Sequence, residues 1–347
     1  DGYAVRAADV TQVPTTLPVV ATSAAGDARP APLATGTAVR IFTGAPVPEG
    51  ADSVVRQEDT TRDGDAVTIT SRRDLGQHVR PAGGDLAVGD AALEAGTRLG
   101  PGQIALLASL GVVEVPVHPR ITVGILTLGD ELADPGDAAV QRAQRLGDAN
   151  LPGLSALVRA LGATAVPLGR VADDVTALTA AIAARAPGQL LLTAGGVSVG
   201  DHDHIPAVMG ELGAEILFRR VRMRPGGPVT FARLPDGTPW LALPGNPVSA
   251  MVTGTLLGGM AIRTLLGWRE SAPAWHEVGL AEPVRPDATL DLFLRVTVAG
   301  APPVARLTGA QGSGITSSVA RASHLLRVPA GGDAALPGPL AVTTFPG

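Results

Sequence analysis

The stretch QLLLTAGGVSVGDHDH, residues 189–204, joins a short apolar run to a loop of glycines, aspartates and histidines. An apolar run that ends in two glycines is typical of a strand buried on both faces. Similar runs, ITVGILTL at 121–128 and ATAVPLG at 163–169, alternate with helical patterns that begin at Asn150 and Asp174. This alternation predicts βαβ units, and therefore a mostly parallel sheet with helices on both faces.

The first of these helices shows the periodicity most clearly. Its apolar residues, from Leu151 to Leu161, recur at helical spacing, and Asn150 is suited to cap its N-terminus. EILFRRVRM at 215–223, PVTFARL at 228–234 and PWLALPG at 239–245 are predicted strands, and a long apolar helix follows Asn246. We therefore expect one α/β domain over residues 119–267.

Two β-rich modules are expected to flank this domain. Residues 8–82 contain short strand-like runs, and residues 268–347 return to alternating strands that suggest a barrel-like domain. Residues 1–7 and 83–118 are assigned to a connecting or dimerisation segment, in which Pro101 opens a short helix. The predicted fold class is α/β multidomain.

Composition excludes several classes of protein. The 347 residues carry a net charge of −5 and only 3% aromatic residues, which gives no footprint for nucleic acid. There is no Cys for thiolate chemistry, and no Lys for a phosphate-binding Walker loop. The absence of Cys fits a reducing compartment, so we expect a cytoplasmic protein. The longest apolar stretch, 250–262, stops at Arg263 before the roughly 18 residues of a membrane span, so we do not expect a membrane protein. The first residue is Asp1 rather than Met, which suggests a fragment without its natural N-terminus.

Acidic and small polar residues follow four predicted strands. Ligands bind beyond the carboxyl ends of parallel strands, so these groups should meet in one crevice. They are Gly129, Asp130 and Glu131 after the first strand, Asp173 and Asp174 after the second, the GGVSVG loop after the third, and Asn246, Pro247 and Ser249 after the fourth.

The GGVSVG loop, residues 195–200, favours an anion. Glycines let backbone amides approach a phosphate closely, although a simple glycine-rich turn would leave the same pattern. Glu131, Asp173 and Asp203 suit oxygen ligation of Mg²⁺, directly or through water. Acids around an anion cradle imply a cation that bridges phosphates.

Other chemistries have weaker support. His202 and His204 suggest zinc, but no third soft ligand is near, so we interpret His202 as a solvated residue and His204 as capping or lining the pocket. Asp130 and Asp174 are interpreted as N-caps or solvated acids. Ser198 has no evident base on a neighbouring strand, which disfavours a serine hydrolase.

The segment RRVRMRPGGP, residues 219–228, is rich in arginine. Alternate residues of a strand point to one face, so some of these arginines should share a face. Arg224 precedes a Pro-Gly-Gly turn and is the best candidate to bind an oxyanion. Arg219, Arg220 and Arg222 are interpreted as surface charge.

Taken in order, the motifs resemble the molybdopterin molybdotransferases, which comprise the MoeA proteins and the E domain of gephyrin. The resemblance covers nearly the whole chain, and eight motifs in the family's order are highly specific. They are DGYAVR at 1, RIFTGAPVPEGADSVV at 40, GGDLAVGD at 83, TLGDEL at 127, GDAN at 147, GGVSVGDHD at 195, LPGNPVSA at 243 and GAQGSG at 309.

The resemblance implies insertion of molybdenum from molybdate into adenylylated molybdopterin, with Mg²⁺-dependent release of AMP. It also implies a homodimer with a shared cleft. In that cleft, the catalytic residues Asp1, Thr43 and Asp85 of one subunit would face Glu131, Asp173 and Asp203 of the other.

The resemblance also assigns the remaining site residues. Glu131, Asp173 and Asp203 would position Mg²⁺ and the attacking water. Gly195, Gly196, Ser198 and Gly200 would hold the pterin phosphate, Asp148 and Asn150 would help to read the pterin, and Arg224 and Ser249 would lie near the oxyanion path. Pro244, Pro247 and Ser313 also match substrate-binding positions of the family.

The chain departs from the family pattern at three places. RPGGP stands where the family commonly has a KPGKP-like turn, so Gly227 replaces a second Lys. Ser323 stands in a stretch where the family usually has Asn, and the family's segment ahead of DGYAV, part of its dimerisation domain, is absent. Two alternatives therefore stay open: a molybdopterin adenylyltransferase similar to the MogA proteins, or a catalytically weakened scaffold of the same fold.

Overall fold

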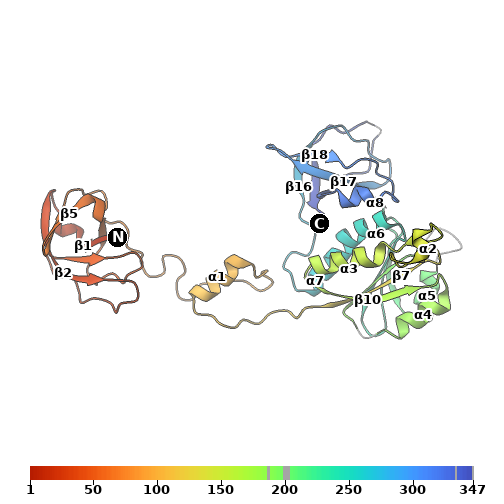
Figure 1. Cartoon of the computed structure of the whole chain (residues 1–347), viewed down its shortest axis with the longest axis horizontal. Coiled ribbons are helices and arrows are strands. Elements are labelled where there is room, and N and C mark those ends of the chain that lie inside the picture. Colours follow the sequence, from red (N-terminus) through yellow and green to blue (C-terminus); the bar gives the residue numbers. More distant parts are fainter. Residues whose placement is uncertain (186–187, 198–203, 333, 346–347) are drawn as a thin grey trace. The chain divides into compact units, whose positions relative to one another are not determined.

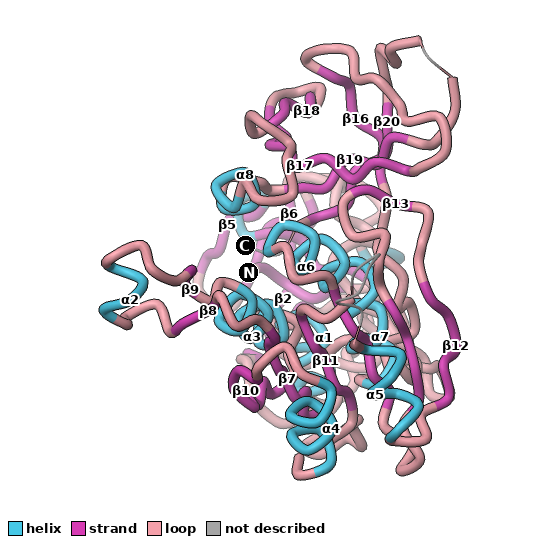
Figure 2. The backbone as a smooth tube through the Cα atoms, turned by 90° about the vertical axis from the view of Figure 1, so that its right-hand side faces the viewer, coloured by secondary structure: helices cyan, strands magenta, loops and turns pink. Residues whose placement is uncertain are grey.

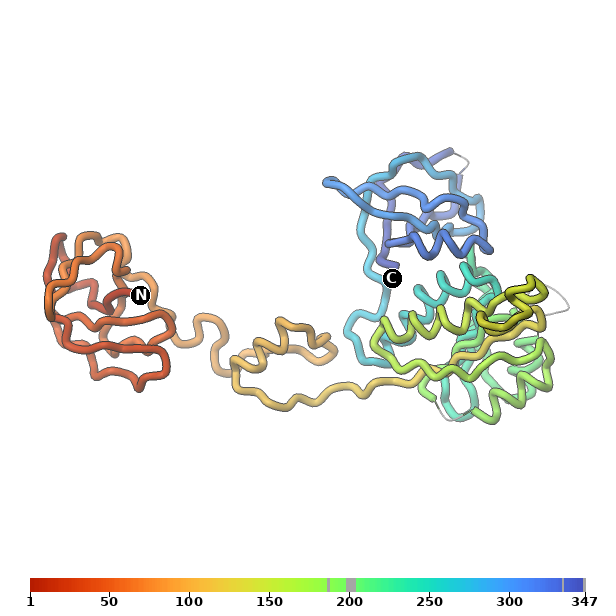
Figure 3. Tube along the Cα trace, in the orientation of Figure 1, coloured from red at the N-terminus to blue at the C-terminus, as the bar shows by residue number. Residues whose placement is uncertain are grey.

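The computed structural model describes residues 1–185, 188–197, 204–332 and 334–345. By its contacts the chain divides into two compact units, Asp1–Ala92 and Leu93–Gly347. Figure 3 follows the chain from red in the first unit to blue in the barrel that ends the second. Each unit has its own hydrophobic core.

The first unit is a small β domain. Its six strands pair in the order β4-β1-β3-β2-β6-β5, and only β2 and β3 run parallel. Tyr3, Val55 and Ile69 are buried in its core. The elements are β1 (Gly2–Val5), the 3₁₀ turn η1 (Ala7–Asp9), β2 (Thr15–Ser23), β3 (Ala38–Ile41), β4 (Ser53–Arg56), the 3₁₀ turn η2 (Gln57–Asp59), β5 (Thr60–Asp63) and β6 (Ala66–Ile69).

Strand β1 differs from expectation, because the sequence placed residues 1–7 in a connecting segment. The structure places Gly2–Val5 inside the sheet, between β3 and β4, with all four residues buried. A Cβ on Gly2 would lie 2.0 Å from the carbonyl oxygen of Val55, so only glycine lets β4 approach this closely. A strand buried on both faces does not alternate polar with apolar residues, and this strand was missed.

The second unit begins with α1 (Pro101–Ser109), the short helix expected at Pro101. None of its residues is buried within the described chain, and the Ile104 side chain is 54% exposed. The α/β domain follows, with β7 (Thr122–Leu128), β8 (Leu132–Ala133), α2 (Ala138–Gln141), β9 (Leu146–Gly147), α3 (Asn150–Ala160), β10 (Thr164–Val171), α4 (Val175–Ala183), β11 (Leu190–Ala194), α5 (Ile205–Glu211), β12 (Glu215–Arg219), β14 (Thr230–Arg233) and β15 (Pro239–Leu243).

The α/β domain has three layers, as the alternating pattern predicts. Its sheet has the order β10-β7-β11-β15-β14-β12, in which the first four strands are parallel and the last two antiparallel. Val123 and Ile125 of β7 pack in a cluster with α3, and Leu126 and Leu128 pack in another with α4 and α5. Figure 1 shows α3 above the sheet, with α4 and α5 below it.

A long helical run closes the upper layer. It consists of α6 (Pro247–Thr253), the π-helical turn η3 (Gly254–Gly258) and α7 (Gly259–Leu265). Among the described residues, Pro247–Leu265 is the one helix whose length and mean hydropathy would allow it to cross a membrane. However, 61% of its most apolar window is buried inside the protein, where Val248, Ala250 and Ile262 contribute to the core. The burial is that of a core helix.

The C-terminal domain is a small barrel. Strands β17-β18-β16-β20-β19 pair in that order, and β19 pairs again with β17 to close the ring. Strand β13 (Met223–Arg224) comes from the α/β domain but pairs in parallel with β17, and Figure 2 follows the chain from β12 up to it. The barrel elements are β16 (His276–Leu280), β17 (Asp291–Ala299), β18 (Val304–Leu307), α8 (Thr316–Ala320), β19 (His324–Val328) and β20 (Leu340–Thr344).

Candidate active site

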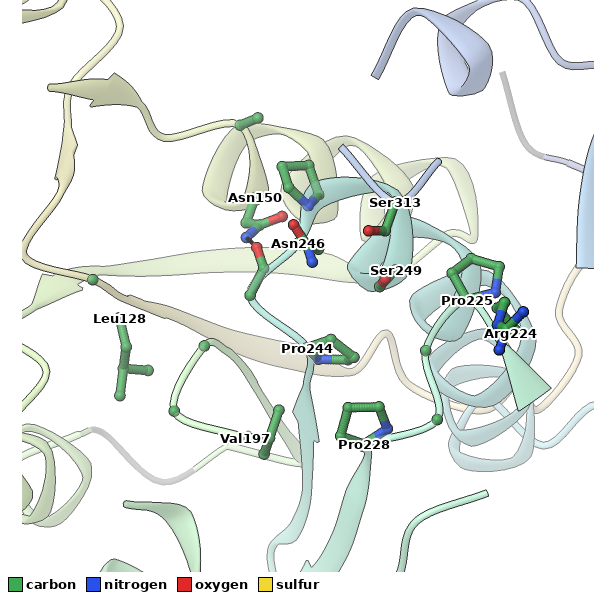
Figure 4. A pocket seen from close by; sticks show the side chains of 18 of the residues that line it. Leu128, Asn150, Val197, Arg224, Pro225, Pro228, Pro244, Asn246, Ser249 and Ser313 are labelled. Atoms are coloured by element: carbon green, nitrogen blue, oxygen red, sulfur yellow. Dashed lines mark hydrogen bonds between the residues drawn. The ribbon is translucent and has the colours of Figure 1, made fainter. Parts of the chain in front are cut away.

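A pocket of about 880 Å³ lies at the carboxyl ends of the parallel strands. The loops after β7, β11 and β15 form its floor, and the barrel loop with Gln311 and Ser313 forms part of its wall (Figure 4). Of the residues predicted for the site, those that line this pocket are Glu131, Asn150, Asp173, Gly195, Gly196, Arg224, Pro244, Pro247, Ser249 and Ser313.

Gly195 turns the chain sharply at the end of β11. Its φ is +109°, and a Cβ at this position would lie 2.6 Å from the carbonyl oxygen of Leu128. Its amide donates to the carbonyl of Leu243, so the loop lies between the ends of β7 and β15. Gly195 and Gly196 therefore bring backbone close to the pocket, as an anion cradle requires. Ser198, Gly200 and Asp203 lie outside the described residues.

One side of the pocket is acidic. The carboxylate oxygens of Glu131 lie 2.8 Å from the place a Cβ on Gly129 would occupy, so this carboxylate folds back over the glycine. Asp173 follows β10, and its Oδ1 is buried with no hydrogen-bond donor in reach among the described residues. A buried carboxylate oxygen that accepts no hydrogen bond is costly, which suggests that a ligand completes it. His204, at the N-cap of α5, places Nε2 3.8 Å from this Oδ1.

The opposite side of the pocket is basic. Arg224 is 66% exposed and pairs with Asp287 at 3.2 Å, and a backbone hydrogen bond from Thr289 lowers the pKa of Asp287. Arg220 lines the same pocket. It holds a left-handed φ of +64° between β12 and β13, so the arginines do not alternate along one strand. The expectation of a shared strand face was wrong for this reason, and Arg220 was missed.

Two buried polar side chains support the pocket floor. Asp148 Oδ1 accepts from the amides of Asn150 and Leu151, and its Oδ2 accepts from Thr127, so Asp148 rather than Asn150 caps α3. Asn150 instead donates to the carbonyl of Gly245 at 2.7 Å. Its Oδ1 is buried and has no donor among the described residues, although Asn150 lines the pocket. The cap expected at Asp174 is confirmed, since its side chain accepts from Ala177.

The barrel loop that carries Ser313 is held by a buried arginine. Arg295 of β17 is fully buried and donates from Nη2 to the carbonyl of Gly312 and from Nε to Ser318. Its amide donates to Gln311, and burial lowers the pKa of its guanidinium to about 10. Arg295 was not predicted; the signal for it is an arginine at a buried position of the strand DLFLRVTV.

Three predicted site residues, Asp1, Thr43 and Asp85, belong to the first unit. Asp1 Oδ1 accepts from the amide of Thr43 at 2.8 Å and from its hydroxyl at 3.2 Å, so these two residues lie together. Asp85 is exposed. Within the described ranges there is no group of three or more His, Asp or Glu side chains that could hold a metal, and the predicted ligand Asp203 falls outside those ranges.

Two family models match the chain. Residues 1–111 match the "MoeA N-terminal region (domain I and II)", and residues 124–263 match a "Probable molybdopterin binding domain". Among solved structures, the molybdopterin biosynthesis MoeA protein of Pyrococcus horikoshii has 25% sequence identity and a TM-score of 0.83. The likeness covers 99% of this chain and 86% of that protein.

Curated relatives agree with these models. A molybdopterin molybdenumtransferase of Synechococcus elongatus is 34% identical over 345 residues, which is 96% of this chain and 83% of the relative. One of Nostoc is 40% identical over 287 residues, or 80% of this chain, and the match spans 64% of that relative's length. Identity of 34% over nearly the whole chain, together with the two family models, shows that the chain belongs to the molybdopterin molybdenumtransferase family.

Proposed function

We propose that this chain inserts molybdenum from molybdate into adenylylated molybdopterin and releases AMP in an Mg²⁺-dependent reaction. The observation that carries the proposal is the division of one pocket into an acidic side, with Glu131 and Asp173, and a basic side, with Arg220 and Arg224. A reaction that cleaves a pyrophosphate link and transfers an oxyanion needs both kinds of group within reach of one substrate.

The pterin would bind against the glycine turn and Asn150. The buried, unpaired Oδ1 of Asn150 suits an N–H donor of the pterin ring, and the hydrogen bonds of Asp148 to the start of α3 hold Asn150 in place. Gly195 and Gly196 would approach the pterin phosphate, and Ser198 and Gly200 are proposed to join them. The assignments of Asn150, Gly195 and Gly196 use groups that the described chain leaves without a hydrogen-bond partner or without a side chain.

Mg²⁺ fits the acidic side. Asp173 Oδ1 is a buried anionic oxygen without a donor, which is the kind of atom a hard cation satisfies. Glu131 and Asp173 would hold the ion together with Asp203. When bound, Mg²⁺ would neutralise charge on the pyrophosphate link. The carboxylates themselves would orient the attacking water and accept its proton.

Molybdate would enter on the basic side. Arg224, Ser249 and Ser313 line the pocket there, and Arg220 adds a second guanidinium. The ion pair of Arg224 with Asp287 is solvent-exposed and therefore weak, so an incoming oxyanion can replace it. Gly227 carries no charge where the family pattern has a Lys, and Arg220 would supply part of what is lost.

We further propose a cytoplasmic homodimer with a shared cleft. Asp1, Thr43 and Asp85 of one subunit would complete the acidic site of the other. The hydrogen bonds of Asp1 to Thr43 support a joint role for these two residues.

The test is a reaction of the purified chain with adenylylated molybdopterin, Mg²⁺ and molybdate. AMP release that depends on molybdate is expected, and Asp203→Asn should abolish it. Consumption of ATP with unmodified molybdopterin, without such release, would identify an adenylyltransferase instead. Binding of molybdopterin with neither reaction would identify a scaffold.

A further inference from the structure

A second cavity, of about 670 Å³, lies at the C-terminal end of the long helical run. It is lined by Thr255 and Arg263 of that run, by Trp268 in the link to the barrel, by Arg98 before α1 and by Thr343 of β20. None of its lining residues lines the candidate active site. The cavity therefore needs its own explanation.

Arg263 is the main cation of this cavity. Its Nε donates to the carbonyl of Ser271 at 2.7 Å, which anchors the guanidinium. Its Nη2 is buried and has no acceptor among the described residues, and none of their carboxylates lies within 4 Å of it. A Cβ on Gly259 would lie only 3.3 Å from Nη1 of Arg263. The absence of a side chain at Gly259 therefore leaves room for the guanidinium to pack against the helix. Burial without an anionic partner lowers the pKa of Arg263.

Thr255 presents a second unpaired group to the same cavity. Thr255 is 6% exposed, and its hydroxyl oxygen is buried with no hydrogen-bond partner in the described chain. Thr343, on the facing strand β20, is equally buried and also lines the cavity. Buried hydroxyls and guanidinium N–H groups that lack partners are rare in folded proteins, and two of them around one cavity indicate a missing acceptor.

The charge of the wall favours an anion. Three arginines line the cavity, namely Arg98, Arg263 and Arg269, against one carboxylate, Glu270. Arg269 also pairs with Glu94. The guanidinium of Arg98 lies 5.2 Å from the ring centroid of Trp268, which holds it at the cavity without neutralising it. Arg98 and Arg263 thus have no carboxylate partner in the described chain.

We propose that this cavity binds a phosphate-type oxyanion, with Arg263 and Thr255 as its principal donors. Donors that come from a helix, a strand and the link between them suit a tetrahedral anion better than a planar carboxylate. The guanidinium would pair with two oxygens of the anion, and each hydroxyl would donate to a further one. This site is independent of the proposed function, because it shares no residue with that pocket.

The test is calorimetric titration of the full chain with inorganic phosphate in a buffer free of phosphate and sulfate. Arg263→Met keeps an unbranched apolar stem but removes the guanidinium, and it should weaken binding at this site by about tenfold or more. Thr255→Val keeps its shape and should weaken binding by about threefold to tenfold. Arg159→Met is the matched control, because Arg159 is an exposed arginine of α3 that lines neither pocket.

Hydrogen exchange locates the binding. Phosphate should protect amides of residues 254–274 in the wild type and in Arg224→Met, which alters the other pocket, but not in Arg263→Met. Titration with ribose 5-phosphate shows whether the site takes a phosphate ester as well as the free anion. Loss of binding of either titrant in Arg263→Met supports the site. Unchanged phosphate affinity in both Arg263→Met and Thr255→Val, or loss of all binding in Arg224→Met, would overturn it. If Arg263→Met fails to fold, the phosphate affinity of Thr255→Val alone tests the proposal, and an unchanged affinity would overturn it.

Discussion

Two carboxylates, the buried Asp74 and the partly exposed Asp173, have opposite surroundings. Asp74 in the small β domain accepts from the side chain of Arg56 at 3.0 Å and from its amide at 3.1 Å, and it lies near Arg73 and His78. Asp173 in the α/β domain has an Oδ1 without any donor among the described residues. A carboxylate with every partner in place stabilises the fold, whereas one with a missing partner is available to a ligand.

The largest effect should come from Asp173→Asn. This change keeps the shape of the side chain but removes the charge proposed to hold Mg²⁺, so molybdate-dependent AMP release should fall about 10³-fold. The thermal midpoint should change little, because Oδ1 accepts no hydrogen bond from the described residues and its contact with His204 is a long one of 3.8 Å. Asp174→Asn is the matched control: asparagine caps a helix as well as aspartate does, so its activity should remain. Equal activity of Asp173→Asn and the wild type would remove Asp173 from the mechanism.

Asp74→Asn should lower stability and leave AMP release unaffected, the opposite of Asp173→Asn. It removes the charge that binds Arg56 and should lower the free energy of unfolding of the small domain by about 3 kcal/mol. Amide hydrogen exchange over residues 2–69 measures this without interference from the second unit. Asp63→Asn, at an exposed carboxylate of β5, should change nothing. If Asp74→Asn and Asp63→Asn show the same amide exchange rates, the network around Asp74 does not stabilise the domain.

The pH dependence of the stability of the small β domain tests the role of Asp74 a second time. Burial opposes ionisation of Asp74, but the hydrogen bonds from Arg56 outweigh it and lower the pKa to about 2. A group whose pKa is lower in the folded state stabilises the fold above its unfolded pKa, near 4, and loses this effect as the pH falls toward 2. The wild-type small domain should therefore lose exchange protection between about pH 4 and pH 2, more steeply than Asp74→Asn. Parallel curves for the two proteins would contradict the assignment.

The smallest expected effect lies on the basic side of the pocket. Gly227→Lys restores the second charge of the family pattern and should tighten molybdate binding about fivefold, or about 1 kcal/mol. The φ of Gly227 is not positive, but a Cβ would lie 3.1 Å from the carbonyl oxygen of Met223, so the gain should be modest. Gly210→Lys, on exposed helix surface, is the control for net charge. No difference between the two in calorimetry would mean that Arg220 and Arg224 suffice.

The elements of the α/β domain could be predicted because their burial is periodic. Helices α3 and α4 and the four parallel strands follow directly from runs and spacings in the sequence. Strand β1 could not be predicted, because all four of its residues are buried and the pattern shows no alternation.

The site was predictable where it follows strand ends, and not elsewhere. Glu131 and Asp173 come directly after strands, so their meeting in one pocket was foreseen. Arg220 depends on a left-handed turn between two short strands, and the role of Arg295 depends on a loop 17 residues further along the chain. Neither local propensity nor spacing encodes such contacts, which tertiary packing alone determines.

Strand β13 has a consequence for energetics. Its two residues belong to the α/β domain by sequence but pair with Asp291 and Leu292 of the barrel, and one of them is Arg224. A ligand that contacts both Arg224 and Ser313 must therefore bind more tightly to the docked barrel than to a detached one. By thermodynamic linkage, each tenfold excess of such a ligand over its dissociation constant makes barrel undocking harder by about 1.4 kcal/mol. A bound ligand would thus raise the free energy needed to separate the barrel from the α/β domain.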